Sequence, residues 1–315
     1  MFIISYVIGS FNLRDFNFSN VSNDVTNEQL KRNFEKIASI IIEEKFDVVA
    51  LQEINAQLPL EYLTRIINCH KNRLREYQCC FGANMPSASR DPERYGFIWN
   101  TKRLRLINTS RGSNPGYYEN AGALGLIRPP YYARFTSRGM LGGTNFELRI
   151  VNTHIRDASR ESDKIKEFDV LVKQILPRIC DHQDITKDGE IMPSYTFLMG
   201  DYNLALNKSE NSIYKIETVT TTTYTGKKRD FRTVQEEKTT LRIPNGQPCI
   251  EDCYANNYDH FTYEISLDRK LLLIPQRIET LNKYYMHIDK PAEKLRTYRR
   301  EVSDHVPICL KIDFM

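Results

Sequence analysis

The hydrophobic residues of this chain fall into short apolar runs separated by polar turns, with a few longer stretches at helical spacing. Residues 3–10 and Val48–Leu51 are apolar runs of the length that forms buried strands. Between them, after a cap at Thr26 or Asn27, apolar residues recur four, seven and eight positions apart. This spacing predicts a helix that ends near Ile42.

The rest of the chain continues this alternation. Residues 146–153 show the period of two that is typical of a strand, and residues 161–180 show the pattern of a long helix. We also predict a helix at 60–69 and strands at 77–81, 96–99, 104–107, 131–136, 195–199, 259–265 and 306–312. With no fixed-period repeat and no Pro/Gly/Ser-rich linker, residues 1–315 are expected to form a single α/β (α+β) domain. Its expected architecture is a two-layer sandwich of mixed β-sheets flanked by helices.

A threonine-rich stretch stands apart from this pattern. Nine threonines occur between Thr218 and Thr240, and Gly226-Lys227-Lys228-Arg229 divides the stretch in two. Threonine favours strands and glycine beside charged residues favours turns, so we predict an inserted hairpin near residues 215–245 with a basic tip. A solvated loop is the alternative. If the tip lay beside a substrate groove, its three cations would bind phosphates there.

Composition excludes several classes of protein. The 315 residues are 41% hydrophobic and 27% charged, which is typical of globular proteins and excludes a disordered or collagen-like chain. The longest purely apolar run, Leu271–Pro275, is far shorter than the span of about 20 residues that a bilayer requires. The seven cysteines form no CxxC pair, so we expect reduced thiols. The N-terminus has no basic residue before Ile3, which favours a first strand over a signal peptide. We therefore expect a cytoplasmic location.

Polar side chains gather at the ends of the predicted strands. They are Asn12, Gln52 and Glu53, Asn152 to His154, Gly200 to Asn203, Tyr258 and Asp259, and Ser303 to His305. Any one of these groups could be a cap or a turn. Six such groups at strand ends, where sheets build binding sites, favour a shared site.

The types of these residues favour phosphate chemistry with a hard metal ion. Asn, Asp and Glu oxygens are the ligands that suit Mg²⁺, and the sequence has no Cys/His cluster of the zinc type. It also lacks the GxGxxG, P-loop and GxSxG motifs, which weakens the case for nucleotide-loop and serine-elbow enzymes. Two histidines have carboxylates as candidate partners. A histidine paired in this way keeps its proton and can bind phosphate or act as a general acid.

Seven segments, taken in order, resemble the endonuclease/exonuclease/phosphatase superfamily. They are FNLRDF, ALQEIN, ERYGFIWN, IVNTHIRD, FLMGDYNL, YDHF and VSDHVPI, and they extend from Asn12 to His305. Within the superfamily, Glu93-Arg94-Tyr95 and Arg128-Pro129-Pro130 resemble the deoxyribonuclease I-like branch. The resemblance implies a deoxyribonuclease I-like fold and a Mg²⁺-dependent phosphodiesterase, with Mn²⁺ able to substitute. The implied activity is that of an endonuclease, with DNA as the favoured nucleic-acid partner.

The resemblance also implies roles for single residues. Asn12, Glu53 and Asp304 would hold the metal ion. Asp201 would orient or deprotonate the attacking water, and Asn203 would support the phosphate.

Two histidines and two arginines complete the implied site. His305, oriented by Asp259, would act on the scissile phosphate, and His154 with Glu93 would form the second pair of the nuclease branch. The implied contacts to the phosphate backbone are Arg14 and Arg128.

Some features leave the substrate open. Asn55 and Asp91 stand where the nuclease branch has side chains that reach into the DNA minor groove. Residues 65–111 carry ten basic and three acidic side chains, a charge of +7 that would attract a polyanion if it lay on one face. A phosphoesterase for a small or lipid substrate, such as an inositol phosphatase or sphingomyelinase, is the first alternative. A binding module with an inactive site is the second.

Overall fold

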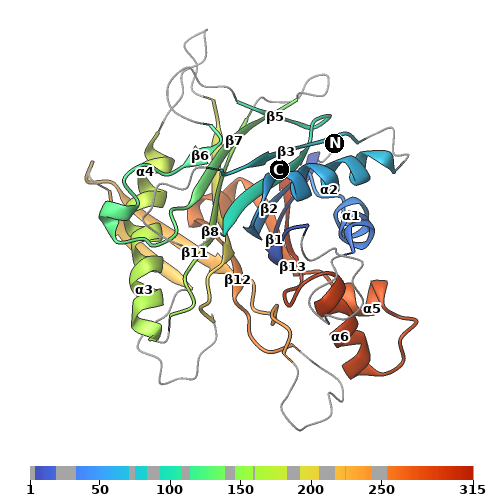
Figure 1. The fold of residues 1–315 in the computed structure, drawn as a ribbon. Helices are drawn as coiled ribbons and strands as arrows, with labels where there is room; N and C mark the ends of the chain where they lie inside the picture. The colour runs from blue at the N-terminus through green and yellow to red at the C-terminus, as the bar shows by residue number, and fades with distance from the viewer. Residues whose placement is uncertain are drawn as a thin grey trace.

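The computed structural model shows two mixed β-sheets that pack face to face, with helices on both outer faces (Figure 1). The residues that the structure describes are 4–18, 33–70, 75–83, 93–107, 114–138, 146–158, 160–182, 192–205, 217–223, 225–242 and 254–314. Within them the architecture is the two-layer α+β sandwich that the sequence predicts, so the predicted fold class is confirmed.

The first sheet has six strands and holds both ends of the described chain. Its order is β13 (Leu271–Arg277), β14 (Ile308–Phe314), β1 (Ile4–Phe16), β2 (Val48–Ile54), β4 (Arg94–Asn100) and β3 (Tyr77–Phe81). β1 runs parallel to β2 and antiparallel to β14. The two termini therefore lie side by side, as Figure 1 shows.

The second sheet has eight strands. Seven of them follow the order β10 (Thr218–Thr222), β11 (Lys228–Val234), β12 (Asp259–Glu264), β9 (Ser194–Asp201), β8 (Glu147–His154), β7 (Tyr131–Ser137) and β5 (Leu104–Leu106). The short strand β6 (Gly116–Tyr117) pairs with β7 beside this path. β8 and β9 are parallel, so their carboxyl ends meet at the same edge of the sheet.

Two groups of helices cover the sandwich. Beside the six-stranded sheet lie α1 (Phe34–Glu43), α2 (Gln57–Cys69), α5 (Thr280–Tyr284) and α6 (Pro291–Glu301) (Figure 1). Beside the eight-stranded sheet lies a continuous helical segment made of α3 (Glu161–Val170), the π-helical turn η3 (Leu171–Ile175) and α4 (Leu176–Asp181). Two 3₁₀ turns, η2 (Gly122–Leu124) and η4 (Ile265–Arg269), lie outside these groups.

The apolar strands are buried on both faces, which explains why they read as continuous apolar runs. In β2, Val48 belongs to the core between the sheets, whereas Val49 belongs to the core under α1 and α2. In β8, Ile150 faces the core between the sheets and Val151 faces α3 and η3. Successive side chains of a strand point to opposite faces, so each strand feeds two cores at once.

Several boundaries differ from the prediction. α1 begins at Phe34, where the Asn33 side chain accepts a hydrogen bond from the backbone N–H of Lys36 and caps the helix. The predicted caps Thr26 and Asn27 lie outside the described residues. The helices α5 and α6 were not predicted, because charged residues interrupt their apolar positions.

The threonine-rich stretch forms an antiparallel pair, β10 with β11, at the edge of the eight-stranded sheet. Its tip is not where a substrate-binding role requires it. β11 runs antiparallel to β12, so Val234 lies at the end that carries Asp259 and Lys228 lies at the other end, roughly 20 Å away at about 3.3 Å per residue. Arg229 is buried and forms ion pairs with Asp181 and Glu264. The prediction that the tip lies beside the substrate and contacts its phosphates is therefore wrong.

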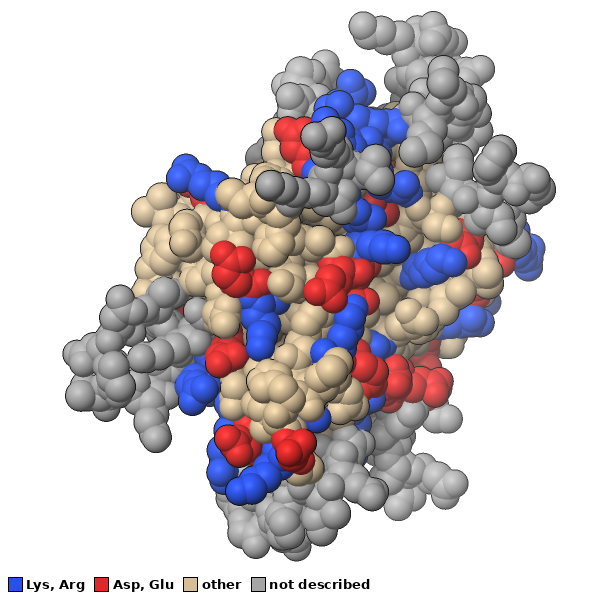
Figure 2. All heavy atoms as spheres, turned by 90° about the vertical axis from the view of Figure 1, so that its right-hand side faces the viewer, with Lys and Arg blue, Asp and Glu red and all other residues tan. Residues whose placement is uncertain are grey.

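The basic segment 65–111 does not form one cationic face in its described part. Arg103 forms an ion pair with buried Asp47, and Lys102 forms one with Glu76. Both pairs lie at one end of the six-stranded sheet, and Glu53 lies at the other end. Figure 2 shows the side of the molecule that carries α1, α2, α5 and α6, where basic and acidic side chains are interspersed. Such a mixed surface does not create a strong field for a polyanion.

Two predictions from composition can be compared with the structure. The described cysteines, namely Cys69, Cys79, Cys80, Cys180 and Cys309, are free thiols, and Cys249 and Cys253 lie outside the described residues. Within the described ranges, no helix combines the length and the apolar character that a membrane crossing needs.

Candidate active site

The predicted site residues meet where the carboxyl ends of β1, β2, β8 and β9 come together. The parallel pairs place Asn12 opposite Gln52 and His154 opposite Asp201. The chain is tightly constrained here. Gly200 has a φ of +149°, and a Cβ at this position would lie 1.8 Å from the carbonyl oxygen of Thr153. Only glycine fits between the two strand ends, which explains the glycine of the GDYN segment.

Two of the candidate side chains start from a left-handed backbone. Glu53 has a φ of +57° and Asn203 a φ of +50°. This conformation is costly for residues other than glycine and occurs preferentially at functional sites. The strain re-aims both side chains away from the direction that a continuing strand would give them, and toward the site.

His305 and Asp259 form the first histidine–carboxylate pair. Nδ1 of His305 lies 2.8 Å from Oδ2 of Asp259, and both side chains are buried. Burial alone would lower the pKa of His305, but the carboxylates of Asp259 and Asp201 outweigh it and hold this pKa well above its ordinary value. The two carboxylates therefore favour the protonated form of His305.

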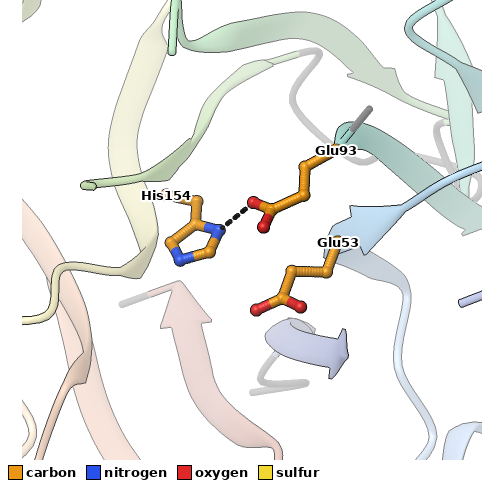
Figure 3. A group of neighbouring side chains, drawn as sticks. All are labelled: Glu53, Glu93 and His154. Atoms are coloured by element: carbon orange, nitrogen blue, oxygen red, sulfur yellow. Dashed lines mark ion pairs between the residues drawn. The ribbon is translucent and has the colours of Figure 1, made fainter. Parts of the chain in front are cut away.

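His154 and Glu93 form the second pair (Figure 3). Nδ1 of His154 lies 3.1 Å from Oε2 of Glu93, and the same oxygen lies 2.8 Å from a guanidinium nitrogen of Arg128. Burial lowers the pKa of His154, while Glu93 and Asp201 raise it and Arg128 lowers it, with a net rise. The backbone N–H of His154 donates to the hydroxyl of Tyr95, which holds the histidine in place from behind.

Both imidazoles turn their second nitrogen to the same carboxylate. Nε2 of His305 lies 3.5 Å and Nε2 of His154 lies 3.6 Å from Oδ2 of Asp201. Asn203 approaches the same place, since its Nδ2 lies 3.3 Å from Nε2 of His154 and its backbone N–H donates to Oδ1 of Asp201. Burial raises the pKa of Asp201 and the two histidines oppose that rise. The structure thus brings a buried carboxylate, two imidazoles and an amide to one point.

Asn12 connects Asp201 to Glu53. The Nδ2 of Asn12 donates to Oε1 of Glu53 at 2.8 Å and to Oδ2 of Asp201 at 3.1 Å. Burial raises the pKa of Glu53, His154 lowers it, and the neighbouring carboxylate of Glu93 raises it further. A buried carboxylate beside a second one is stabilised by a bound cation, so these oxygen donors fit a hard divalent metal ion.

The groups that could hold a metal are only partly the predicted set. Among the described residues, the donor atoms of Glu53, Glu93 and His154 lie within 4.8 Å of one another, and so do those of Asp201, Asp259 and His305. In Figure 3 the side chains of Glu53 and Glu93 both point toward His154. Asp304 belongs to neither group.

Asp304 and Arg14 form an ion pair at the rim of the site. NH1 of Arg14 lies 3.1 Å from Oδ2 of Asp304, and NH2 of Arg299 lies 3.9 Å from the same oxygen. The structure therefore brings Asn12 and Glu53 together but turns Asp304 toward two guanidinium groups. Arg128 likewise contacts Glu93, and its side chain is only 10% exposed.

Sequence reasoning did not assign a role to several buried polar residues that support the site. Nε2 of Gln52 donates to Oδ1 of Asn152 at 2.6 Å, and Nδ2 of Asn152 donates to the carbonyl oxygen of Leu51. The hydroxyl of Ser303 donates to the carbonyl oxygen of Asn12 and accepts from the backbone N–H of His305. The sequence feature that could have identified them is their position, because each lies within two residues of a predicted site residue.

Comparisons with solved structures agree with this geometry at the level of fold. An endonuclease/exonuclease/phosphatase family protein from Bacteroides thetaiotaomicron matches with a TM-score of 0.55 and 12% identity over 100% of both chains. D. rerio TDP2 complexed with a single-strand DNA product matches with a TM-score of 0.52 and 15% identity over 98% of each chain. ANGEL2, a 2′,3′-cyclic phosphatase, matches with a TM-score of 0.53 and 14% identity over 99% of this chain and 96% of that one.

No family model and no curated protein matches this sequence. The fold that the sequence resemblance implies is nevertheless confirmed, because solved structures described as endonuclease/exonuclease/phosphatase proteins match over 100% and 99% of this chain.

Proposed function

We propose that this protein is a divalent-metal-dependent phosphoesterase that hydrolyses phosphodiesters. The observation that carries the proposal is the convergence of His154 and His305, each bound to its own carboxylate, on the single buried carboxylate of Asp201. Two imidazoles whose carboxylate partners favour the protonated form bind the anionic oxygens of a phosphate, and charge that builds up in the transition state is stabilised there.

The chain's own groups account for the other requirements of hydrolysis. Asp201 has a pKa raised by burial and accepts a proton from the attacking water. His305 and His154 donate hydrogen bonds to the phosphate through Nε2, because Nδ1 of each is engaged with Asp259 or Glu93. The amide of Asn203 contributes a further donor beside His154.

Glu53 would hold the divalent metal ion, with Mg²⁺ favoured because carboxylate donors are oxygens. Asn12 is proposed as a second ligand from the sequence, although in this structure its Nδ2 faces Glu53 and its Oδ1 accepts the backbone N–H of Arg14. A bound metal ion supplies Lewis-acid stabilisation of the phosphate oxygens. Asp304 is proposed as a further ligand from the sequence, although in this structure it contacts Arg14.

DNA is the substrate we favour, and a small phosphoester is the second candidate. The nuclease proposal is supported by the Glu93–His154 pair and by the fold shared with TDP2, which is described in complex with single-strand DNA. The second candidate is supported by the fold shared with ANGEL2, a cyclic phosphatase, and by the charge distribution. The basic side chains Lys102 and Arg103 form ion pairs at the end of the six-stranded sheet away from the site. At that distance they do not contact the phosphates of a polynucleotide bound in the site.

One set of assays tests both parts of the proposal. The protein is incubated with Mg²⁺ and bis(p-nitrophenyl) phosphate, p-nitrophenyl phosphate, supercoiled plasmid or single-stranded DNA. We expect hydrolysis of the diester, its loss in EDTA, and its recovery with Mg²⁺ or Mn²⁺. Glu53→Gln should abolish turnover without lowering the Tm, whereas Glu76→Gln, which removes an exposed carboxylate at the far end of the same sheet, should change neither. Full activity in EDTA would refute the metal-dependent mechanism, and inactivity toward DNA with turnover of the small diester would favour the second candidate.

A further inference from the structure

The threonine-rich stretch ends in a short segment, residues 238–241, that lies between two loops of the site; we call it the strap. On one side, the backbone N–H of Leu241 donates to the carbonyl oxygen of Asp304 at 2.7 Å. Thr240 forms a β-bridge with His305 on the same side. On the other side, the backbone N–H groups of Thr239 and Thr240 both donate to the carbonyl oxygen of Asn256, at 2.7 and 2.9 Å. The strap thus joins the loop that carries His305 to the loop that leads to Asp259.

The side chain of Thr239 makes the connection to Asp259 direct. Thr239 is completely buried, and its Oγ1 accepts hydrogen bonds from the backbone N–H groups of Tyr258 and Asp259, both at 3.2 Å. Its carbonyl oxygen accepts from the backbone N–H of Val306 at 2.9 Å, one residue after His305. One residue therefore holds the backbone at both members of the Asp259–His305 pair.

We propose that Thr239 is the positioning residue of the Asp259–His305 pair, and that the strap sets the distance between the two loops. The inference rests on the proposed phosphoesterase function. A buried N–H group that loses its acceptor has no water to replace it, so the loop has to move until it finds another partner. Asp259 would move with it, and the imidazole of His305 would lose the carboxylate that orients it.

The test separates the hydroxyl from the rest of the side chain. Thr239→Val keeps the shape and removes the acceptor, whereas Thr239→Ser keeps the acceptor. The matched control is Thr233→Val, because Thr233 is also buried but its hydroxyl lies 2.9 Å from that of Thr262, between β11 and β12. The readouts are kcat and KM for bis(p-nitrophenyl) phosphate with saturating Mg²⁺, and the Tm of each variant. Thr239→Ala is measured as a second variant without the hydroxyl, should the valine variant melt below the assay temperature.

We expect kcat to fall on the order of 10- to 100-fold in Thr239→Val, as is typical when the support of a site residue is removed, with little change in KM. Thr239→Ser should recover most of the turnover, and Thr233→Val should match the unsubstituted protein. Wild-type kcat in a folded variant without the hydroxyl would overturn the proposal, as would a serine variant no more active than the valine one. A wild-type protein without phosphoesterase activity would instead refute the proposed function.

A double-mutant cycle shows whether Thr239 acts through Asp259. In an Asp259→Asn background the pair is already broken, so adding Thr239→Val should lower kcat by less than about twofold. A merely structural effect would be additive and would multiply the two losses. Full additivity would therefore also overturn the proposal.

Discussion

The two histidine–carboxylate pairs of the site are built from the two sheets in opposite senses. In the first pair, the eight-stranded sheet supplies the carboxylate, since Asp259 begins β12, and His305 lies just before β14 of the six-stranded sheet. In the second pair, the eight-stranded sheet supplies His154 at the end of β8, and Glu93 lies just before β4 of the six-stranded sheet. Each pair therefore spans the interface between the layers, and neither can form unless both sheets are packed.

The two pairs differ in their surroundings. Asp259 is 1% exposed, its backbone N–H donates to Thr239, and its Oδ2 lies 2.8 Å from Nδ1 of His305. Glu93 is 19% exposed and shares its Oε2 between His154 and Arg128. The first pair is thus almost fully buried, whereas in the second pair the carboxylate is more exposed and its Oε2 is shared with Arg128. The same two residue types therefore give pairs of different strength. The carboxylate of Asp259 strongly favours the protonated form of His305, whereas Arg128 weakens the effect of Glu93 on His154.

Removing the imidazoles should have the largest effect. His305→Ala is expected to lower kcat for a small phosphodiester toward the upper end of the 10²- to 10⁴-fold range typical of a positioned acid or charge, and His154→Ala toward the lower end. The reason is that the pKa of His305 is held well above its ordinary value and its partner Asp259 is almost fully buried, whereas Glu93 shares its Oε2 between His154 and Arg128. Steady-state kinetics with circular dichroism as a folding control measures the difference. An equal loss in both variants would show that the two pairs are equivalent.

Removing the carboxylates should have a smaller effect of the same sign. Asp259→Asn replaces the charge that holds Nδ1 of His305, and we expect kcat to fall on the order of 100-fold because the imidazole loses its orientation and its proton. Glu93→Gln should cost about tenfold, since Asp201 still attracts the proton of His154. The measurement is kcat at a fixed pH, and a larger loss in Glu93→Gln than in Asp259→Asn would reverse the comparison.

The pH dependence should sharpen the comparison further. Both histidine pKa values are raised, so each imidazolium is present at low pH and is lost as the pH rises through the pKa of the folded protein. Activity and the stabilising contribution of each pair should therefore fall on the alkaline side, with His154 losing its proton first. Arg128 lowers the pKa of His154, so Arg128→Gln should move the alkaline limb of kcat/KM to higher pH.

The control for the pH experiment is Arg105→Gln, an exposed arginine on β5, which should leave the limb in place. A shift of the Arg128→Gln limb to lower pH would contradict the assignment of that limb to His154.

The smallest effect on activity is expected at the tip of the β10–β11 hairpin, far from both pairs. Lys227→Ala and Lys228→Ala should leave kcat, KM and the salt dependence of DNA binding unchanged, because the tip lies at the opposite end of β11 from the site. Arg229→Met should instead lower the free energy of unfolding by about 3 kcal/mol, since it leaves Asp181 and Glu264 without their buried cation. Chemical denaturation and a salt series of DNA binding measure the two effects, and a shallower salt slope in the lysine variants would restore a binding role for the tip.

Part of the site was predictable because it depends on local rules. Buried strands on both faces of a sheet read as apolar runs, and a polar residue directly after such a run must lie at a sheet edge. Val48–Leu51 followed by Glu53, and Tyr195–Met199 followed by Asp201, are two cases in which the strand and its functional end come from one short segment. The predictions for these segments needed no knowledge of what lies across from them.

Thr239 shows where local rules end. In the sequence it is one of nine threonines in a stretch of high strand propensity, and nothing distinguishes it from Thr233 or Thr218. Its hydroxyl acquires a role only because the loop before β12 crosses it and places two backbone N–H groups within 3.2 Å. Hydrogen-bond partners twenty positions away along the chain leave no periodic trace in the sequence.

By itself, the sequence determined most of the strands, the helices of the first two-thirds of the chain, the two-layer class of the fold and the residue types at the strand ends, since these follow from the spacing of apolar and polar positions. It did not reveal α5, α6 or β13. Only the tertiary structure decided which charged side chains form ion pairs. Arg229 is buried against Asp181 and Glu264, and Arg14 pairs with Asp304. A charge acts through its distance to other charges and through its burial, and both are set by segments that are remote in sequence and meet only when the two sheets pack.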